Sequence, residues 1–350
     1  MRWLPFGFGY LYAAAVLAGV VWQGAWLAAP ALLSFVVLPL VDASVGLHLW
    51  NPAPADEARL ARSRALRLVT WGWVPVGVGV TLYAIATAAS PSCTWSERLW
   101  LALGVGLMNS VVGIVYAHEL VHQASRFEQF LGEVLLTLVT YTHFRIEHVF
   151  GHHRYIGTPR DPATARYGEG FYRFWARSVY GQLRSAWYLE CDRLARAGRA
   201  RISFSNRALM YALVIVAVYA AIGLAWGWVG VALFALQSAI AFTSLEITNY
   251  VEHYGLLRAR REDGSYETVR PSHSWNSAHR ITNWFLINLG RHSDHHAAAS
   301  RRWQILRTYD EEAAPQLPSG YAAMYLLALV PPLWFAVMNP RVREADVARA

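Results

Sequence analysis

The sequence predicts an all-α integral membrane protein with about six transmembrane helices and a histidine-rich cytoplasmic cap. Hydrophobic residues make up 55% of the 350 residues and charged residues only 15%, which is unusual for a soluble protein. Apolar stretches recur that approach or exceed the roughly 17–25 residues that a spanning helix needs. Nine of the 13 histidines fall into four short clusters. One membrane-embedded domain over residues 1–350 is the simplest organisation.

Six apolar stretches predict the spanning helices, at residues 7–21, 24–41, 68–90, 99–117, 208–226 and 229–245. The first two are joined only through Trp22 and Gln23, which predicts a tight helical hairpin. The last two similarly meet at Gly227. No cleavable signal peptide is predicted, because a second apolar span follows the first at once.

The basic residues predict the orientation in the membrane. If both ends of the chain lie inside, the loop with Arg59, Arg62, Arg64 and Arg67 and the polar blocks 118–206 and 251–350 are cytoplasmic. Only Arg98 then lies on the far side, in agreement with the positive-inside rule. We therefore expect a multi-pass protein of the bacterial cytoplasmic (inner) membrane, with every histidine cluster on the cytoplasmic side.

The segments outside the spans give further helix predictions. The NPAPADEAR opening of residues 51–67 suits a turn followed by a surface helix. The apolar stretch 130–142 predicts a half-buried helix within the first cytoplasmic block. Residues 322–338 contain Pro331 and Pro332, which favours an interfacial or broken helix over a seventh span.

The histidine clusters have the spacing of metal ligands. They are His118 and His122 in HELVH, His148, His152 and His153 in EHVFGHH, His253 in NYVEHYG, and His292, His295 and His296 in RHSDHH. Residues four apart share a helix face, so HELVH can bind one metal ion with two imidazoles. His148 and His152 repeat this spacing, and His153 adds an adjacent ligand. Nine imidazoles exceed the four or six ligands of a single tetrahedral or octahedral ion, which predicts two ions. Imidazole suits iron, copper, zinc and nickel alike, so the ligands do not name the metal.

The surroundings of the clusters narrow the chemistry. A site reached through apolar helices suits a water-insoluble substrate, and inert C–H bonds yield to iron and dioxygen rather than to hydrolysis. Acidic neighbours can accept hydrogen bonds from ligating imidazoles and fix their orientation, although helix capping and surface charge are alternative roles. These neighbours are Glu119, Glu147, Asp161, Glu252 and Asp294, and three further histidines that can act in the same way are His143, His273 and His279.

The motifs HELVH, EHVFGHH, NYVEHYGLLR and LGRHSDHHA, with SHSWNSAHR and TPRDPATAR between them, resemble the membrane-bound alkane 1-monooxygenase family. That family lies within the wider group of histidine-rich, di-iron membrane hydroxylases and desaturases, and NYVEHYG separates it from ordinary desaturases. The resemblance implies six spanning helices, two iron ions held by the nine histidines, dioxygen as co-substrate, and electrons from rubredoxin and its reductase. Two positions depart from the family pattern, Gln123 in place of lysine and Gly290 in place of glutamine.

The resulting hypothesis is terminal hydroxylation of medium- to long-chain alkanes or alkyl groups to 1-alkanols. A fatty-acyl or other lipid hydroxylase or desaturase with the same metal centre is the nearer alternative. An intramembrane zinc peptidase built on His118, Glu119 and His122 would use the same HExxH spacing. A metal transporter would instead place ionisable groups near the bilayer midplane. Small residues on the second span, including Ser34, are predicted to lie beside the substrate channel.

The cysteines and the net charge indicate the partners. Cys93 and Cys191 fall on opposite sides of the membrane and form no CxxC pair, which excludes an internal disulfide and a thiolate-bound iron site. Electrons must therefore come from another protein. The 31 basic and 23 acidic residues give a net charge of +8, which favours anionic lipid and an acidic redox partner over nucleic acid.

Overall fold

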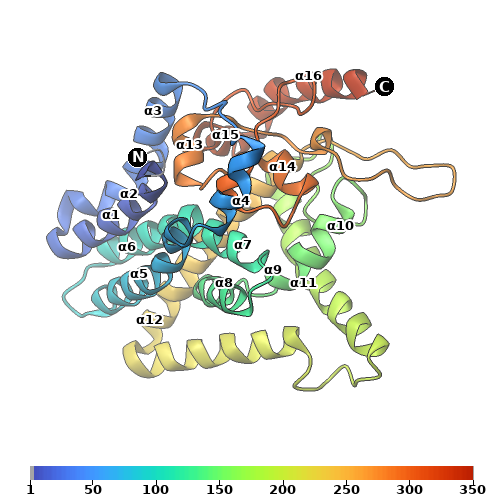
Figure 1. The fold of residues 1–350 in the computed structure, drawn as a ribbon. Helices are drawn as coiled ribbons and strands as arrows, with labels where there is room; N and C mark the ends of the chain where they lie inside the picture. The colour runs from blue at the N-terminus through green and yellow to red at the C-terminus, as the bar shows by residue number, and fades with distance from the viewer. Residues whose placement is uncertain (1–3, 350) are drawn as a thin grey trace. The chain divides into compact units, whose positions relative to one another are not determined.

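The computed structural model describes residues 4–349, and within them the fold is helical. Pairing of β type is limited, in this part of the chain, to isolated bridges such as Leu47 with His279 and Asn276 with Gln316. The predicted all-α class is confirmed. Figure 1 shows the helices with the labels used below.

Contacts divide the chain into two compact units, each assembled from three separate stretches. The first unit comprises the described residues up to Val37, then Arg64–Ile146 and Ala186–Leu245. The second unit comprises Leu38–Ser63, Glu147–Ser185 and the chain from Glu246 onward. The single domain expected over residues 1–350 stays a prediction.

Helices of the first unit are α1 (Tyr10–Trp22), α2 (Ala29–Leu32), α5 (Arg64–Ala89), α6 (Trp95–Met108), α7 (Val115–Val121) and α8 (Arg126–Leu138). Helices of the second unit are α3 (Leu38–Val45), α4 (Pro54–Arg62), α10 (His153–Tyr155), α13 (Arg280–Phe285), α14 (His292–Ala297), α15 (Tyr321–Ala328) and α16 (Pro331–Arg349). Three helices include residues of both units: α9 (Phe144–Glu147), α11 (Phe171–Arg196) and α12 (Arg207–His253). The expected surface helix after residue 51 is α4, and the expected break at Pro331 separates α15 from α16.

Short turns of other helical types join these elements. The 3₁₀ turns are Leu4–Gly7, Gly24–Ala28, Pro271–His273 and Trp303–Ile305. The π-helical turns, in which the backbone closes from residue i to i+5, are Leu33–Val37, Asn109–Ile114 and His148–His152. Turns of the π type are rare and are found disproportionately at functional sites. Here one of them contains two of the clustered histidines.

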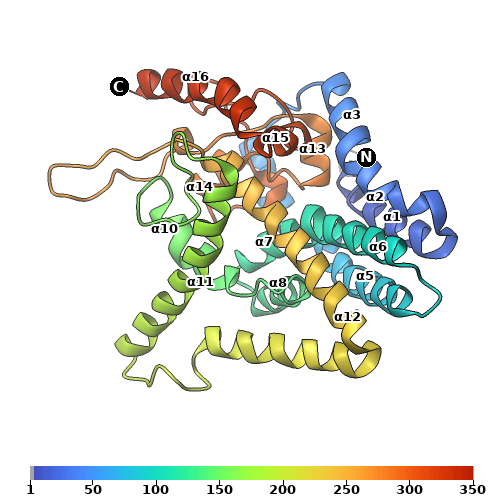
Figure 2. The same cartoon turned by 180° about the vertical axis from the view of Figure 1, so that it is seen from behind.

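Five helical segments among the described residues are long and apolar enough to cross a membrane, which makes this a multi-pass membrane protein. They are Pro5–Trp22, Gly24–Val45, Arg64–Ala89, Trp95–Val121 and Arg207–His253. The last has 47 residues and contains both of the final predicted spans. It bends at Gly227, whose φ of 64° is readily accessible only to glycine, and Figures 1 and 2 show the two arms on either side of this bend.

The first unit supports α7, the helix that contains His118 and ends directly before His122. The span that ends in α7 is tied to neighbouring helices by Asn109, whose side-chain amide donates to Thr81 on α5 at 3.0 Å and to Gln237 on α12 at 3.1 Å. Helix α8 packs directly against α7. Polar bonds inside an apolar bundle are costly to break because no water is available to replace them. The network therefore fixes the span from which α7 continues.

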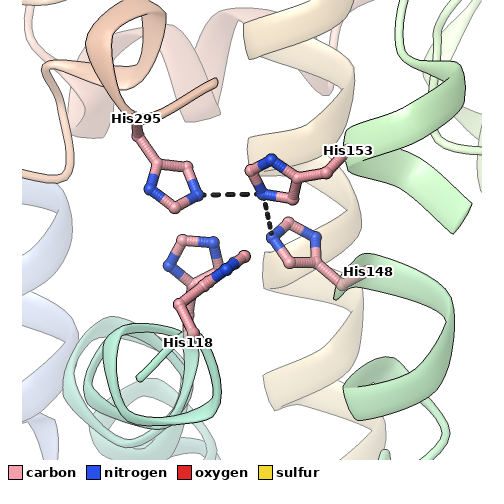
Figure 3. Close-up of side chains that lie close together, drawn as sticks. His118, His148, His153 and His295 are labelled. Carbon is pink, nitrogen blue, oxygen red and sulfur yellow. Dashed lines mark hydrogen bonds between the residues drawn. The ribbon is translucent and has the colours of Figure 1, made fainter. Parts of the chain in front are cut away.

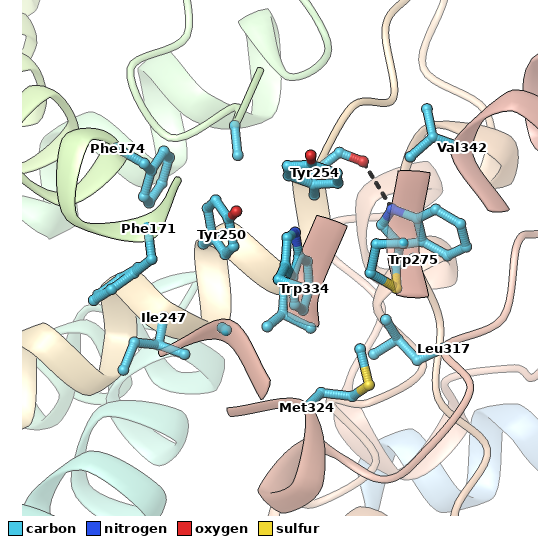
Figure 4. Close-up of a cluster of buried hydrophobic side chains, with 14 of the residues drawn as sticks. Phe171, Phe174, Ile247, Tyr250, Tyr254, Trp275, Leu317, Met324, Trp334 and Val342 are labelled. Atoms are coloured by element: carbon cyan, nitrogen blue, oxygen red, sulfur yellow. Dashed lines mark hydrogen bonds between the residues drawn. The ribbon is translucent and has the colours of Figure 1, made fainter. Parts of the chain in front are cut away.

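An aromatic core organises the second unit around the end of α12 (Figure 4). Tyr250 and Tyr254 pack against Trp334 of α16, with ring centroids 4.9 and 5.3 Å apart. The indole N–H of Trp275 donates to the carbonyl oxygen of Tyr254 at 2.9 Å, and its backbone N–H donates to that of Glu252 at 2.9 Å. These contacts hold in place the helix end that carries His253.

The carboxylate of Asp42 caps α13 from a distant part of the chain. It accepts the backbone N–H groups of Ile281 at 2.9 Å and Thr282 at 3.2 Å, as well as the hydroxyl of Thr282. The side chain is only 3% exposed. Its removal would leave buried donors without an acceptor, which costs roughly 1–3 kcal/mol for each such group.

We therefore expect Asp42→Ala to destabilise the detergent-solubilised protein by roughly 3 kcal/mol, the cost of about two unsatisfied donors. Thermal unfolding followed by circular dichroism measures the effect. Asp42→Asn is the matched control, because its amide oxygen still accepts one of the bonds, and it should lose less. Equal unfolding temperatures for Asp42→Ala and the unchanged protein would show that this cap contributes nothing.

Candidate metal centre

The nine clustered histidines are divided between the two units. His118 and His122 belong to the first unit, and the other seven belong to the second. The ring of His118 on α7 packs edge-on against that of His122, the residue after the helix, with centroids 4.8 Å apart, as expected for residues four apart on one helix face. The ring of Phe144 lies 6.0 Å from that of His118.

One group in the second unit contains His152, His253, His292 and His296, all of them buried. One ring nitrogen from each lies within 4.8 Å of the corresponding nitrogens of the others. The Nε2 atom of His292 is 2.9 Å from that of His296 and 3.2 Å from that of His253. Three separate segments of the chain thus deliver imidazoles to one point.

The second group in this unit contains His148, His153 and His295. Figure 3 shows their rings joined in a chain by dashed lines. The Nε2 atom of His153 is 3.1 Å from that of His148 and 3.0 Å from that of His295. The ring planes of His148 and His295 are nearly parallel, at 10°.

The π-helical turn His148–His152 explains why adjacent histidines belong to different groups. Because this turn closes at i+5 rather than i+4, His153 comes to lie beside His148. The side chain of His152 lies instead in the four-histidine group. On α14 the ordinary helical spacing pairs His292 with His296 in one group, and His295 joins the other. Sequence spacing alone had suggested His148 with His152.

Both groups have the chemistry of cation sites. A neutral imidazole carries a proton on one nitrogen and a lone pair on the other. Burial, followed by the neighbouring imidazole of His153, lowers the pKa of His296 well below its ordinary value and so favours the neutral ring. Nε2 atoms that face one another in threes cannot all find a proton donor among themselves, whereas a metal cation would bind all of their lone pairs. The residues present therefore fit a metal.

Comparison with known proteins decides the family. The chain is 42% identical over 311 residues to alkane 1-monooxygenase 2 of Pseudomonas aeruginosa, which covers 88% of this chain and 82% of that protein. It is 38% identical over 336 residues to the alkane 1-monooxygenase of Ectopseudomonas oleovorans, covering 96% and 79%. The chain belongs to the alkane 1-monooxygenase family. The resemblance seen in the motifs is thereby confirmed.

The chain is also similar to two groups of proteins outside the alkane 1-monooxygenase family. The fatty acid desaturase family model matches residues 94–328. The hydroxylase component of xylene/toluene monooxygenase from Pseudomonas putida is 29% identical over 259 residues, which is 72% of this chain and 67% of that protein. Membership makes this protein an oxygenase enzyme and sets aside the zinc peptidase and the metal transporter.

Asp161 has the contacts of an acidic residue that orients a histidine ring. Its Oδ2 atom accepts from Nδ1 of His152 at 2.9 Å, and both side chains are almost completely buried. The same oxygen accepts the hydroxyl of Thr164 at 2.6 Å, and Oδ1 accepts the backbone N–H of Ala163 at 3.0 Å. With its proton held on Nδ1, His152 presents the lone pair of Nε2 to the other three histidines.

Glu252 approaches the nitrogen of His292 that faces the other rings, whereas a residue that only orients a ring contacts its other nitrogen. Its Oε2 atom is 3.2 Å from Nε2 of His292, the nitrogen that faces the other rings. Its Oε1 atom accepts the hydroxyl of Tyr321 at 2.7 Å. No sequence pattern pointed to Tyr321, because it lies 69 positions after Glu252 on a helix outside every motif.

The other three acidic residues have different partners. Asp294 was expected to orient an imidazole, but its carboxylate binds the guanidinium of Arg301, the backbone N–H of Arg307 at 2.9 Å and the hydroxyl of Tyr309 at 2.7 Å. It thus anchors the loop after α14. Glu119 accepts the side-chain amide of Gln123 at 2.9 Å.

The side chain of Glu147 is buried, and its pKa is higher than that of an ordinary glutamate. Burial, and after it the nearby carboxyl groups of Asp161 and Glu246, raises the pKa of Glu147 and favours its protonated form. A protonated carboxyl group is a weaker acceptor for an imidazole N–H than a carboxylate. Its expected role as an acceptor therefore has less support than that of Asp161.

The second departure from the family pattern, Gly290, has a steric reason. A Cβ atom at this position would lie 2.9 Å from Oδ1 of Asn283 and 3.0 Å from the carbonyl oxygen of Ser277. Ser277 also donates its backbone N–H to the carbonyl of Gly290 at 2.8 Å. The chain here is too close to its neighbours for a glutamine side chain.

The three additional histidines have contacts of their own. The ring of His143 in the first unit packs edge-on against Tyr141 at 4.2 Å, and burial lowers its pKa to about 4. In the second unit, His273 lies 3.0 Å from Glu267 and accepts the backbone N–H of Arg270 at 3.0 Å. Nδ1 of His279 is 3.1 Å from the hydroxyl of Ser277. Neither His273 nor His279 belongs to the two histidine groups of the second unit.

Ser34, the residue predicted to lie beside the substrate channel, is buried in the first unit. Its hydroxyl lies 2.7 Å from that of Tyr12 on α1 and 2.9 Å from the carbonyl oxygen of Pro30, to which it donates. The side chain is 5% exposed and belongs to the π-helical turn Leu33–Val37. Its place beside a channel stays a prediction.

Proposed function

We propose that this protein hydroxylates the terminal carbon of medium- to long-chain alkanes or alkyl groups to 1-alkanols, with dioxygen and two electrons from a rubredoxin. The observation that carries the proposal is the pair of histidine groups, one fully and one largely buried, in a chain of this oxygenase family. The reaction takes place on the cytoplasmic side of the bacterial cytoplasmic membrane, where the arginine distribution puts the histidine clusters.

In this proposal two iron ions are held by histidines alone. His152, His253, His292 and His296 hold one ion. His148, His153 and His295 hold the other. His118 and His122 of the HELVH motif complete the nine ligands that the family resemblance implies. Iron bound at these sites supplies the activation of dioxygen that an unreactive C–H bond requires.

The surrounding residues of the protein keep the imidazoles neutral, orient them and exclude water from them. Burial favours the neutral form of His296, and Asp161 orients His152. The aromatic core around Tyr250 and Tyr254 keeps water away from His253, the ligand at the end of α12. An alkyl chain that arrives end-on from the bilayer would present its methyl group before its weaker internal C–H bonds, which accounts for terminal selectivity.

The need for an external electron donor follows from the cysteines. Cys93 and Cys191 are the only two cysteines of the sequence, too few to supply the four thiolates that hold an iron cluster. The net charge of +8 favours a negatively charged partner. Rubredoxins are usually acidic, in keeping with the donor that the family resemblance implies.

The experiment is turnover of the detergent-solubilised protein on a panel of alkanes and fatty acids, with rubredoxin, its reductase and isotope-labelled dioxygen. Bound metal is counted in the same samples. We expect two irons per chain and a 1-alkanol that carries one labelled oxygen atom. An iron-loaded protein that consumes the donor's electrons but labels no alkane would overturn the proposal.

A lipid-modifying activity is the second candidate, because the fatty acid desaturase model matches residues 94–328. The same panel distinguishes the two. Labelled hydroxy acids or unlabelled unsaturated acids, formed in place of 1-alkanols, would retain the metal centre and change the substrate.

Chain-length selection gives a prediction for the first unit. If Ser34 lies beside the channel, Ser34→Trp should shorten the longest alkane accepted, because the indole would fill space that the chain end needs. The measurement is the product profile over alkanes of increasing length. Leu32→Trp is the matched control, since Leu32 is 52% exposed on the same segment and should leave the profile unchanged.

Two results would contradict this placement. An unchanged length limit in Ser34→Trp would move the channel elsewhere. A shortened limit in Ser34→Ala, which removes only the hydroxyl bonded to Tyr12 and Pro30, would assign the effect to helix packing rather than to bulk.

A further inference from the structure

Residues 199–206, within the loop between α11 and α12, expose two large apolar side chains; this segment is called loop 199–206 below. Ile202 is 81% exposed and Phe204 is 87% exposed. Single exposed apolar residues are ordinary, but a contiguous apolar surface marks contact with a partner or a membrane. These two residues stand directly before Arg207, where a membrane-crossing segment begins.

Hydrogen bonds keep this loop from folding its apolar side chains back onto the protein. Arg193 donates to the carbonyl oxygen of Ser205 at 2.6 Å, and Arg199 donates to the hydroxyl of the same residue at 3.0 Å. The side-chain amide of the buried Asn206 donates to the carbonyl of Arg201 at 2.7 Å. The loop is therefore a braced element that holds Ile202 and Phe204 outward.

A buried carboxylate anchors this brace at its base. Glu190 has no exposed side-chain surface and forms ion pairs with Arg193 at 2.6 Å and Arg207 at 2.8 Å. Burial alone would raise the pKa of Glu190, but the hydrogen bonds from the two arginines outweigh it and lower the pKa to about 2. The carboxylate is therefore ionised throughout the physiological pH range, and both arginines face a negative charge over that range.

The charge around the loop identifies what covers it. Arg196, Arg199 and Arg201 are exposed, and Asp192 is the one acidic residue between Cys191 and Asn206. Arginine beside exposed apolar residues is the combination found where proteins lie in the headgroup region of anionic membranes. A second copy of this chain docked on the same loop would instead bring like charges together.

We propose that loop 199–206 is a membrane anchor, in which Ile202 and Phe204 insert into the interfacial region of an anionic bilayer and Arg196, Arg199 and Arg201 bind lipid phosphates. The anchor fixes the depth at which α12 enters the membrane. It is independent of the reaction catalysed.

A nitroxide spin label at Phe204→Cys tests the insertion. The full-length protein is placed in nanodiscs that hold one chain each, and the label's collisions with dioxygen and with a water-soluble nickel complex are compared. We expect dioxygen to dominate at position 204 and the nickel complex to dominate at Ser265→Cys, an exposed loop position used as the control. The unchanged protein reports background labelling, which should be small because Cys93 and Cys191 are buried.

Two outcomes would overturn the insertion. Nickel accessibility at position 204 equal to that at position 265 would place the loop in water. Shielding that is absent in single-chain discs and present in vesicles, with dipolar broadening between labels, would show that a second copy covers the loop.

The lipid headgroups are tested in discs of phosphatidylcholine with and without phosphatidylglycerol. We expect the anionic lipid to lower the nickel accessibility of the label at position 204 about twofold. The pair Arg196→Gln and Arg201→Gln should abolish this change, and both side chains lie outside the bonds that brace the loop. An equal response with and without the two arginines would overturn the phosphate contacts.

Discussion

Replacing His292 with alanine should remove one metal ion per chain and abolish turnover. Its Nε2 atom is the meeting point of the four-histidine group, 2.9 Å from His296 and 3.2 Å from His253. Loss of residues that merely support ligands already costs about 10–100-fold in metal affinity or activity, so loss of a ligand should exceed that. Metal content after dialysis, together with product formation, measures both effects.

His273→Ala is the matched control, because it removes another buried histidine of the same unit. That ring lies 3.0 Å from Glu267 and accepts the backbone N–H of Arg270, and it belongs to neither histidine group of this unit. It should keep both metal ions. If His292→Ala also keeps two ions, or if His273→Ala loses one, the assignment of the four-histidine group is wrong.

The sequence predicted the ligand types but not their grouping. Spacing of four residues suggested His148 with His152, and the π-helical turn pairs His148 with His153 instead. A turn of this type depends on how the surrounding helices constrain the backbone, and no residue pattern in EHVFGHH predicts it. Metal-ligand spacing therefore identified the residues, whereas the backbone geometry decided their partners.

The acidic partners show the limit of arguments from adjacency. All five candidates were chosen because they stand near a histidine in the sequence, yet Asp294 turns to Arg301 and Tyr309. Asp161 is nine positions from His152 and reaches it through a loop. Tyr321 contacts Glu252 across 69 positions. Contacts of this range depend on tertiary folding, which local sequence patterns do not encode.

Hydropathy predicted the helices of the fold well, because the lipid environment imposes the length and composition of each span. Gly227 was correctly identified as a junction, and the structure adds that its backbone has a positive φ within one long helical segment. The sequence did not predict that each unit is assembled from three separate stretches of the chain. Stretches such as Leu38–Ser63 and Glu246 onward, far apart in the chain, share a unit only through contacts such as Asp42 with Thr282.

The second large effect concerns Asp161. Asp161→Asn should weaken metal binding about 10–100-fold, the usual cost of losing a group that orients a ligand. The carboxylate accepts the proton on Nδ1 of His152 at 2.9 Å and thereby leaves the lone pair on Nε2 for the metal. An amide can donate to Nδ1 instead, which moves the ring proton to Nε2 and blocks that lone pair. Competition with a chelator for bound iron measures the change.

The variant Thr164→Val tests whether Asp161 acts by orienting the ring of His152 or by ordering the loop of residues 157–164. This variant removes the hydroxyl that donates to Asp161 at 2.6 Å and accepts from Gly157 at 3.0 Å, while the bond between Asp161 and His152 remains. We expect it to keep most of its metal affinity. An equal loss in Thr164→Val and Asp161→Asn would mean that the carboxylate acts by ordering residues 157–164, whereas a loss confined to Asp161→Asn would assign the effect to the proton on His152.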